Sequence, residues 1–333
     1  MPATLKDVAL AAGVSIRTVS RVVNNQGEIG EDTRQRIWKI IQELDYRPNQ
    51  LARSMITGKT LAVGIIIPDI TDAFFPEFIL GAETCARDRN FNVFLCNANR
   101  QPDLELKYVD LLSQRQVDGI IMAGSQLNED GLVKAIRGHH AVILTPNVIP
   151  DTTIFTINDF DGCRQIGRYL LELGHRRVGF VEGTWSKSAM PRKKGLTAAF
   201  DQAGFENAVT VTSIFPATIE NACSATKGLI AQHPEITALV GYNDNVAIGI
   251  LQACRELGKA VPQDISVVGF DDIPEASRST PALTSWHIDR MRLGSEMMTT
   301  LLDEISGNEI QHRQVMVDGL LVKRDSTAAA GIA

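Results

Sequence analysis

One short segment near the N-terminus carries side chains that could recognise a DNA duplex. Ile16, Arg17, Thr18, Ser20 and Arg21 fall on the outward face of a helix predicted by the spacing of apolar residues. Arginine can donate two hydrogen bonds to guanine, hydroxyl groups can contact phosphate, and an apolar side chain can contact a thymine methyl. The segment therefore predicts a helix whose N-terminal half meets base edges in the major groove.

The helices that would hold this face can be traced on both sides of it. A short amphipathic helix precedes it, Gly13 supplies a turn that favours positive φ, and Ser15 can cap the second helix. A third periodic helix is predicted over 33–44. The apolar seam between the first two helices would consist of Val8, Ala12, Val14, Val19, Val22 and Val23. The pattern predicts a helix-turn-helix, and plain helix packing is the alternative.

Charge is distributed unevenly along the 333 residues, whose net charge is −6. Residues 1–60 contain nine Lys or Arg against six Asp or Glu, a net charge of +3. The remaining residues contain 24 against 33, a net charge of −9. Because phosphate binding needs only a local basic surface, the N-terminal segment is compatible with DNA binding, and the acidic remainder would be held away from the duplex.

The composition is typical of a soluble globular protein, with 44% apolar and 22% charged residues. The length favours about two or three domains. The N-terminal residues given show no apolar h-region, and no apolar run approaches the ~20 residues of a membrane span. The five cysteines are scattered, which favours a reducing compartment over a disulfide framework. We therefore expect a cytoplasmic protein.

The sequence contains none of the common catalytic motifs that would favour an enzyme. The motifs GxGxxG, GxxxxGK[ST] and GxSxG do not occur in the sequence. His139, His140 and His175 are not arranged with a nucleophile, and no Cys and His cluster suggests a metal. We therefore expect no catalytic residue, no metal and no cofactor.

The third helix is followed by the segment YRPNQLARSM at 46–55. Together with the helix-turn-helix, this segment resembles the LacI/GalR family of bacterial transcription regulators, and the resemblance continues to about Ser326. It implies a homodimer that binds palindromic double-stranded operator DNA, represses carbohydrate-metabolism genes and responds to a small sugar-type effector. The alternative is a solute-binding protein of the periplasmic type, which would need a signal peptide and would not need residues 1–57.

The resemblance also assigns DNA contacts residue by residue. It implies base contacts for Ile16, Arg17 and Arg21, with Arg21 as a two-bond donor to guanine. Phosphate or positioning contacts are implied for Ser15, Thr18, Ser20 and Asn24. The hinge contacts are Asn49, Ala52 and Met55. In the hinge, the apolar Met55 would wedge into a base step in the minor groove, and the small Ala52 would permit close approach of the two hinge helices. A solvated helix face is the alternative for the residues of the second helix.

From Leu61 onward, strands and helices alternate as in doubly wound α/β units. We therefore expect an α/β protein with an all-α helix-turn-helix head and two doubly wound parallel-sheet lobes, which resemble the periplasmic binding protein fold. The expected units are a head at 1–48, a hinge at 49–60 and an effector-binding and dimerisation body at 61–333. Within the body, lobe 1 is expected at 61–157 plus 290–315, and lobe 2 at 158–286 plus 316–326. Chain crossings are expected near 157–158, near 286–289 and between 311 and 317.

Ligands of open parallel sheets bind at the carboxyl ends of strands, so the residues after each predicted strand are candidates. The candidate effector contacts, several of them matched to the family, are Phe74, Phe75, Ser186, Ser188, Arg192, Asn243, Asp271 and Arg290. Carboxylate, guanidinium and amide groups suit a polyol in a partly apolar cleft. The alternatives are packing inside the lobe for Phe74 and Phe75, and capping of the following helix or loop for Asn243 and Asp271.

Two departures from the family bear on the effector. Purine-binding relatives carry an arginine and a threonine where this chain has Ser186 and Ser188, which argues against a nucleobase. Arg290 could meet a carboxylate or a phosphate, which leaves sugar acids and sugar phosphates open. Parts of lobe 2, including 242–249, are most similar to the maltose-gene regulators of the family.

The resemblance further implies how effector and DNA are coupled. The effector would close the cleft, shift the two first lobes of a dimer and change the folding of the paired hinge helices. Such coupling is typically worth about 1–3 kcal/mol. We expect the sugar to relieve repression. The tail after Ser326 has no heptad repeat, so a coiled-coil tetramer is not expected.

Overall fold

The computed structural model describes residues 3–23, 27–46, 59–184, 186–308 and 313–331. The chain divides into two compact units, Met1–Thr60 and Leu61–Ala333, called the head and the body below. Among the described residues, no helix is both long and apolar enough to cross a membrane. The predicted DNA contacts Asn24, Asn49, Ala52 and Met55 lie outside the described residues.

The head is a small helical unit. Its helices are α1 (Leu5–Ala12), α2 (Ile16–Val23) and α3 (Glu31–Glu43). Val19 and Ile37 are fully buried in its apolar core. Gly13 ends α1 at φ +64°, where a Cβ atom would be strained. The Ser15 hydroxyl accepts the backbone N–H of Thr18 at 3.1 Å, which caps α2 as predicted.

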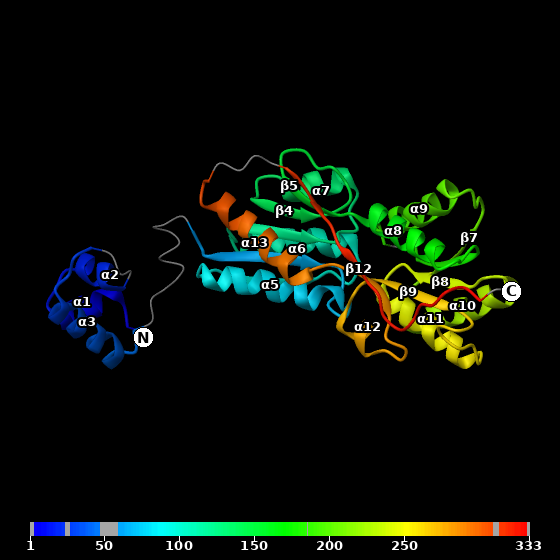
Figure 1. Ribbon diagram of the computed structural model, residues 1–333. Helices are drawn as coiled ribbons and strands as arrows, with labels where there is room; N and C mark the ends of the chain where they lie inside the picture. The colour runs from blue at the N-terminus through cyan, green and yellow to red at the C-terminus, as the bar shows by residue number, and fades with distance from the viewer. Residues whose placement is uncertain (1–2, 24–26, 47–58, 185, 309–312, 332–333) are drawn as a thin grey trace. The chain divides into compact units, whose positions relative to one another are not determined.

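Lobe 1 of the body is a six-stranded sheet covered by helices on both faces (Figure 1). The strand order is β11-β5-β4-β3-β1-β2, and every pairing is parallel. Along β1, Val63 and Ile65 pack into one core with α5 and α13, while Ala62 and Ile66 pack into another with α6 and α7. The elements are β1 (Ala62–Ile67), α5 (Phe74–Asp88), β2 (Asn92–Asn97), α6 (Pro102–Gln114), β3 (Gly119–Ala123), α7 (Glu129–Ile136), β4 (Ala141–Leu144), β5 (Thr153–Ile157), α13 (Arg290–Ile305) and β11 (Gln314–Val317).

Lobe 2 repeats this plan with the strand order β12-β10-β9-β8-β6-β7. Its pairings are parallel except for β10 with β12, which is antiparallel. The elements are α8 (Asp159–Glu172), β6 (Val178–Gly183), α9 (Ala189–Gln202), β7 (Val209–Ile214), α10 (Ile219–Gln232), β8 (Ala238–Gly241), α11 (Asp244–Glu256), β9 (Ser266–Asp271), α12 (Pro274–Arg278), β10 (Thr284–His287) and β12 (Leu320–Val322). The expected fold class is therefore confirmed.

The chain passes between the lobes after β5, after β10 and after β11. The predicted boundary of lobe 1 at 315 needs correction, because Met316 and Val317 continue β11 and pair with β5 in the first sheet. The third crossing thus lies beyond Val317. Asn158 at the first crossing donates a hydrogen bond from Nδ2 to Oδ1 of Asp318 at 2.8 Å, which ties two crossings together.

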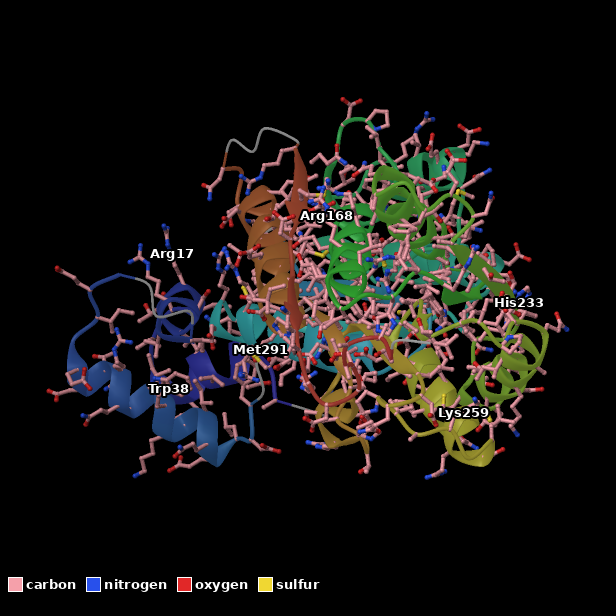
Figure 2. All side chains as sticks on the ribbon, turned by 45° about the vertical axis from the view of Figure 1, so that its right-hand side comes forward. Arg17, Trp38, Arg168, His233, Lys259 and Met291 are labelled. Atoms are coloured by element: carbon pink, nitrogen blue, oxygen red, sulfur yellow. The ribbon has the colours of Figure 1, made fainter. Side chains whose placement is uncertain are left out.

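Glycines allow α5 and α13 to pack closely on lobe 1. A Cβ atom on Gly81 would lie 2.0 Å from the carbonyl oxygen of Met291, and one on Gly294 would lie 2.0 Å from that of Phe78. Neither distance is possible for a larger residue without moving the backbone. Met291 is labelled on α13 in Figure 2. This packing fixes the start of α13, just after the second crossing.

Candidate functional site

On the head, the predicted base-contacting side chains lie on one surface of α2. Ile16, Arg17 and Arg21 are exposed, and Ile16 is 48% exposed although it is apolar. Thr18 and Ser20 are half-buried at the side of the same helix. Figure 2 shows Arg17 pointing outward from the head. The described surface is therefore compatible with the predicted groove contacts, which remain predictions.

In the body, one cavity lies where the carboxyl ends of strands from both sheets meet. It has a volume of about 820 Å³, including space open to solvent. The predicted contacts that line it are Phe74, Phe75, Ser186, Ser188, Arg192, Asn243 and Asp271. Residues predicted from separate strand ends thus come together, as the geometry of parallel sheets leads one to expect.

Arg192 is held in one orientation by several parts of lobe 2. Its Nε donates to Oδ1 of Asp159 at 2.8 Å, its Nη1 to the Tyr242 carbonyl at 2.5 Å, and its Nη2 to Oδ1 of Asp271 at 3.2 Å. Its guanidinium carbon lies 3.7 Å from the centroid of the Phe270 ring. Burial disfavours the charge, but the two carboxylates outweigh burial and raise the pKa of Arg192. The cavity therefore contains a permanent, preorganised cation.

Asp271 occupies the last position of β9 with φ at +101°, which is a strained conformation for a residue with a Cβ atom. Burial raises the pKa of its carboxyl to about 7, although the charge of Arg192 opposes this shift and that of Asp72 adds to it. The group therefore changes charge near neutral pH. It can act as a hydrogen-bond donor when protonated and only as an acceptor when ionised.

Three of the candidate effector contacts, Asn243, Phe74 and Phe75, also cap a helix or pack inside the lobe, which are the alternative roles given for them above. Asn243 accepts the backbone N–H of Val246 at its Oδ1 at 3.0 Å and so caps α11, while it also lines the cavity. Phe74 and Phe75 are both buried in the lobe core with their ring centroids 5.2 Å apart, and they also form part of the cavity wall. The neighbouring Asp244 is not one of the candidates; it stabilises the loop after β9, because it accepts the backbone N–H of Ile273 at 2.8 Å.

Arg290 does not line the cavity, and the prediction that it contacts the effector needs correction on this ground. Its side chain is 2% exposed and is engaged by protein groups. Nη2 donates to Oε2 of Glu77 at 2.6 Å and to the carbonyl of Asp272 at 3.1 Å, and Nη1 donates to the carbonyl of Asp271. Arg290 therefore connects α5 in lobe 1 with the end of β9 in lobe 2.

Sequence reasoning missed several charged and polar residues of the cavity, namely Asp72, Arg100, Asp159, Lys187 and Tyr242. Arg100 follows β2 and Asp159 follows β5, so the rule on strand ends would have found both if applied to every strand. Arg100 pairs with Asp72 at 2.9 Å and with Asp69 at 3.4 Å. Burial raises the pKa of Tyr242 to about 12, which keeps its hydroxyl protonated.

Lys187 forms a direct contact across the cleft. It belongs to lobe 2, and its Nζ donates to the carbonyl oxygen of Leu127 in lobe 1. Nearby, the buried Glu105 accepts the backbone N–H of Gln126 at 2.8 Å. Burial lowers the pKa of Lys187, and the charge of Glu105 opposes this shift. The contact therefore links the two lobes at the cavity.

The charges along the cavity wall are balanced. The cations are Arg100, Lys187 and Arg192, and the acidic residues are Asp72, Asp159 and Asp271. Arg100 and Arg192 are both held in ion pairs with these acids. Because no excess of positive charge faces the cavity lining, the site suits an uncharged polar ligand better than an anion.

Comparison with known proteins places the chain in a family. Residues 4–49 match the model of "Bacterial regulatory proteins, lacI family". Residues 60–324 match "Periplasmic binding proteins and sugar binding domain of LacI family". The chain belongs to the LacI family. The predicted family is thus confirmed, and the family of transcription regulators agrees with the expectation that the protein is not an enzyme.

Among relatives of this LacI-family protein, "HTH-type transcriptional repressor PurR" of Edwardsiella ictaluri (strain 93-146) is 32% identical, over 98% of this chain and 97% of the relative. A lac repressor dimer bound to operator and the anti-inducer ONPF has a similar structure, with a TM-score of 0.90 and 25% identity over 99% and 100% of the two chains. The transcriptional regulator CelR in complex with cellobiose has a TM-score of 0.72 and 26% identity over 97% and 99%. The similarity to maltose-gene regulators remains a prediction.

Proposed function

We propose that this protein is a dimeric repressor of carbohydrate-metabolism genes that binds a palindromic operator in the cytoplasm. In this proposal, a neutral sugar enters the cavity between the lobes and releases the protein from DNA. The observation that carries the effector assignment is the buried cluster of Arg192, Asp159 and Asp271, which offers fixed hydrogen-bonding groups in a cavity of balanced charge.

The cavity chemistry supports a sugar over other small molecules. A sugar ring has apolar faces and a rim of hydroxyl groups, which can both donate and accept hydrogen bonds. Phe74 and Phe75 supply an apolar wall, while Ser188, Asn243 and Asp271 supply polar atoms. Arg290 is not among the lining residues and is paired with Glu77, which removes the reason to expect a sugar acid or a sugar phosphate. The similar CelR structure contains cellobiose.

The surface of lobe 1 supports a dimer. Large apolar side chains are exposed on β2, an edge strand, and on the helices α5 and α6 that flank it in sequence. They are Leu80, Phe94, Leu95, Leu106 and Leu111. An apolar edge strand favours pairing with another chain, and burying this surface in a homodimer would protect it. A dimer would also present two heads to the half-sites of a palindrome.

The proposal can be tested with the purified full chain and a DNA duplex selected from a random library. A set of neutral sugars is screened by thermal shift, since a ligand that binds only the folded state raises the melting temperature. We expect one sugar class to raise it and to weaken operator binding, measured by fluorescence anisotropy, by about 5–150-fold.

A Ser188→Ala variant tests whether this cavity receives the sugar, because the substitution removes one hydroxyl without breaking a buried ion pair. It should weaken the sugar response and leave operator affinity without sugar unchanged. DNA binding with no response to any sugar would refute the effector assignment. Sugar binding without selective DNA binding would instead support a solute-binding protein.

A further inference from the structure

A second cavity lies beside the first, and the two share part of their walls. Asp72, Arg100, Ser186, Tyr242 and Asn243 line both of them. The second cavity has a volume of about 960 Å³, including space open to solvent. We call the first the inner cavity and the second the outer cavity. Because the same side chains face both, a ligand longer than one sugar ring could contact residues of both cavities at once.

The outer cavity is formed by loops at the carboxyl ends of strands from both lobes. Lobe 1 contributes Asp69 and Thr71 after β1, and lobe 2 contributes 215–218 between β7 and α10. Phe215 lines this cavity and is 61% exposed as a residue. An aromatic face bordered by hydroxyl, amide and carboxylate groups matches a sugar ring, which is apolar on its faces and polar at its edge.

The charge of the outer cavity further restricts the ligand. Its charged lining residues are Asp69, Asp72 and Glu220, against the single cation Arg100. Arg100 is itself paired with Asp69 and Asp72. A phosphate or carboxylate in this position would face an excess of negative charge, which disfavours anions. The outer cavity therefore disfavours a phosphate or carboxylate on this part of the ligand.

We propose that the effector is a neutral disaccharide, with one ring in the inner cavity and the other in the outer cavity against Phe215. This inference rests on the proposed function, in which a neutral sugar is the effector. The inner ring is held by the Arg192 and Asp271 cluster. The shared residues Arg100, Tyr242 and Asn243 lie along the bond that joins the two rings.

The test measures the affinity of the full chain by isothermal titration calorimetry. The probes are glucose, galactose and fructose, and the disaccharides maltose, cellobiose, trehalose, lactose and sucrose. One disaccharide should bind at least about tenfold more tightly than any of its constituent monosaccharides. Replacing Phe215 by Ala should weaken binding of that disaccharide by about tenfold and change monosaccharide binding by less than about twofold.

Val211→Ala is the matched control, because Val211 is an exposed apolar residue of the preceding strand outside both cavities. It should leave both affinities unchanged. Phe215→Leu keeps an apolar side chain without the aromatic ring, and it should reproduce most of the loss. Thermal unfolding of each variant checks that the fold is intact.

The outcomes separate this inference from the proposed function. If a monosaccharide binds as tightly as every disaccharide, or if Phe215→Ala leaves disaccharide binding unchanged, the disaccharide inference is refuted and the sugar effector stands. If no sugar of either size binds, both the inference and the sugar effector are refuted.

Discussion

Arg192 and Asp159 form an ion pair in which Nε and Oδ1 are 2.8 Å apart and both side chains are only 4% exposed. Asp159 is the first residue of α8, directly after the chain has crossed from lobe 1, and Arg192 lies in the first turn of α9. The pair therefore joins the start of lobe 2 to the wall of the inner cavity. Removing either partner of an ion pair buried this deeply leaves an unpaired charge in the interior, which lowers the stability of the fold.

Replacing Asp159 by Ala should lower the free energy of unfolding by about 3 kcal/mol, because Arg192 would lose its shortest carboxylate contact in a buried site. Urea unfolding measures the change. Asp161→Ala is the control on the same helix, since Asp161 pairs with Arg164 where both side chains are about 30% exposed. That loss should stay below about 1 kcal/mol. Equal losses in the two variants would contradict the role assigned to Asp159.

The raised pKa of Asp271, about 7 in the folded protein against 3.8 for an ordinary carboxyl, predicts a pH effect on stability. Between these two values, the unfolded chain loses the proton while the folded chain keeps it. Wild type should therefore lose stability relative to Asp271→Asn as the pH rises from about 4 to about 7, and the difference should be constant above that range. Urea unfolding at a series of pH values measures it, and a difference that grows in favour of wild type would overturn the assignment.

Phosphorylated sugars should bind poorly. Arg290 is engaged by Glu77 and by backbone carbonyls, so it offers no positive charge to a ligand in the cavity. The 6-phosphate of any sugar that binds should therefore bind at least about tenfold more weakly than the neutral sugar. Calorimetry with the matched pair of ligands measures this. Tighter binding of the phosphate would contradict the balanced charge that is assigned to the cavity wall.

Arg21→Ala should weaken binding to the selected operator by about 1–3 kcal/mol and should relax the preference for guanine at one position of each half-site. Arg36→Ala, on the exposed surface of α3, removes the same charge and should weaken binding to all sequences about equally. Anisotropy titrations against operator variants compare the two proteins. Unchanged selectivity in Arg21→Ala would contradict the predicted reading position.

A charge on the apolar edge of lobe 1 should disrupt the proposed dimer. Phe94 is 46% exposed on β2, so Phe94→Lys should be tolerated by the fold and should shift the protein towards monomer. Sedimentation equilibrium measures the change, and operator affinity should fall with it. A dimer of unchanged strength would exclude this edge from the interface. Leu257→Ala, at an exposed apolar residue of lobe 2, is the control.

The spacing of residue types along the sequence was sufficient to predict the helices of the head and the alternation of strands and helices in the body. Gly13 and Ser15 act on groups within a few residues of themselves, so their roles follow from sequence neighbours alone. The same holds for β1, whose unbroken apolar run predicts burial on both faces of a sheet. Asp271 could be proposed as a site residue because parallel sheets gather their strand ends at one edge, and Arg192 because the resemblance to the family implied it.

The tertiary structure decided which charged residues face the cavity. Arg290 and Arg100 are both arginines close to strand ends, yet Arg290 is taken up by Glu77, which lies 213 positions away in the sequence, while Arg100 lines both cavities. The partner of a charged side chain depends on which distant acids and carbonyl groups the fold brings within a few ångströms. Sequence spacing carries no information about these distances, so the chemistry of the cavity followed from the packing of the two lobes.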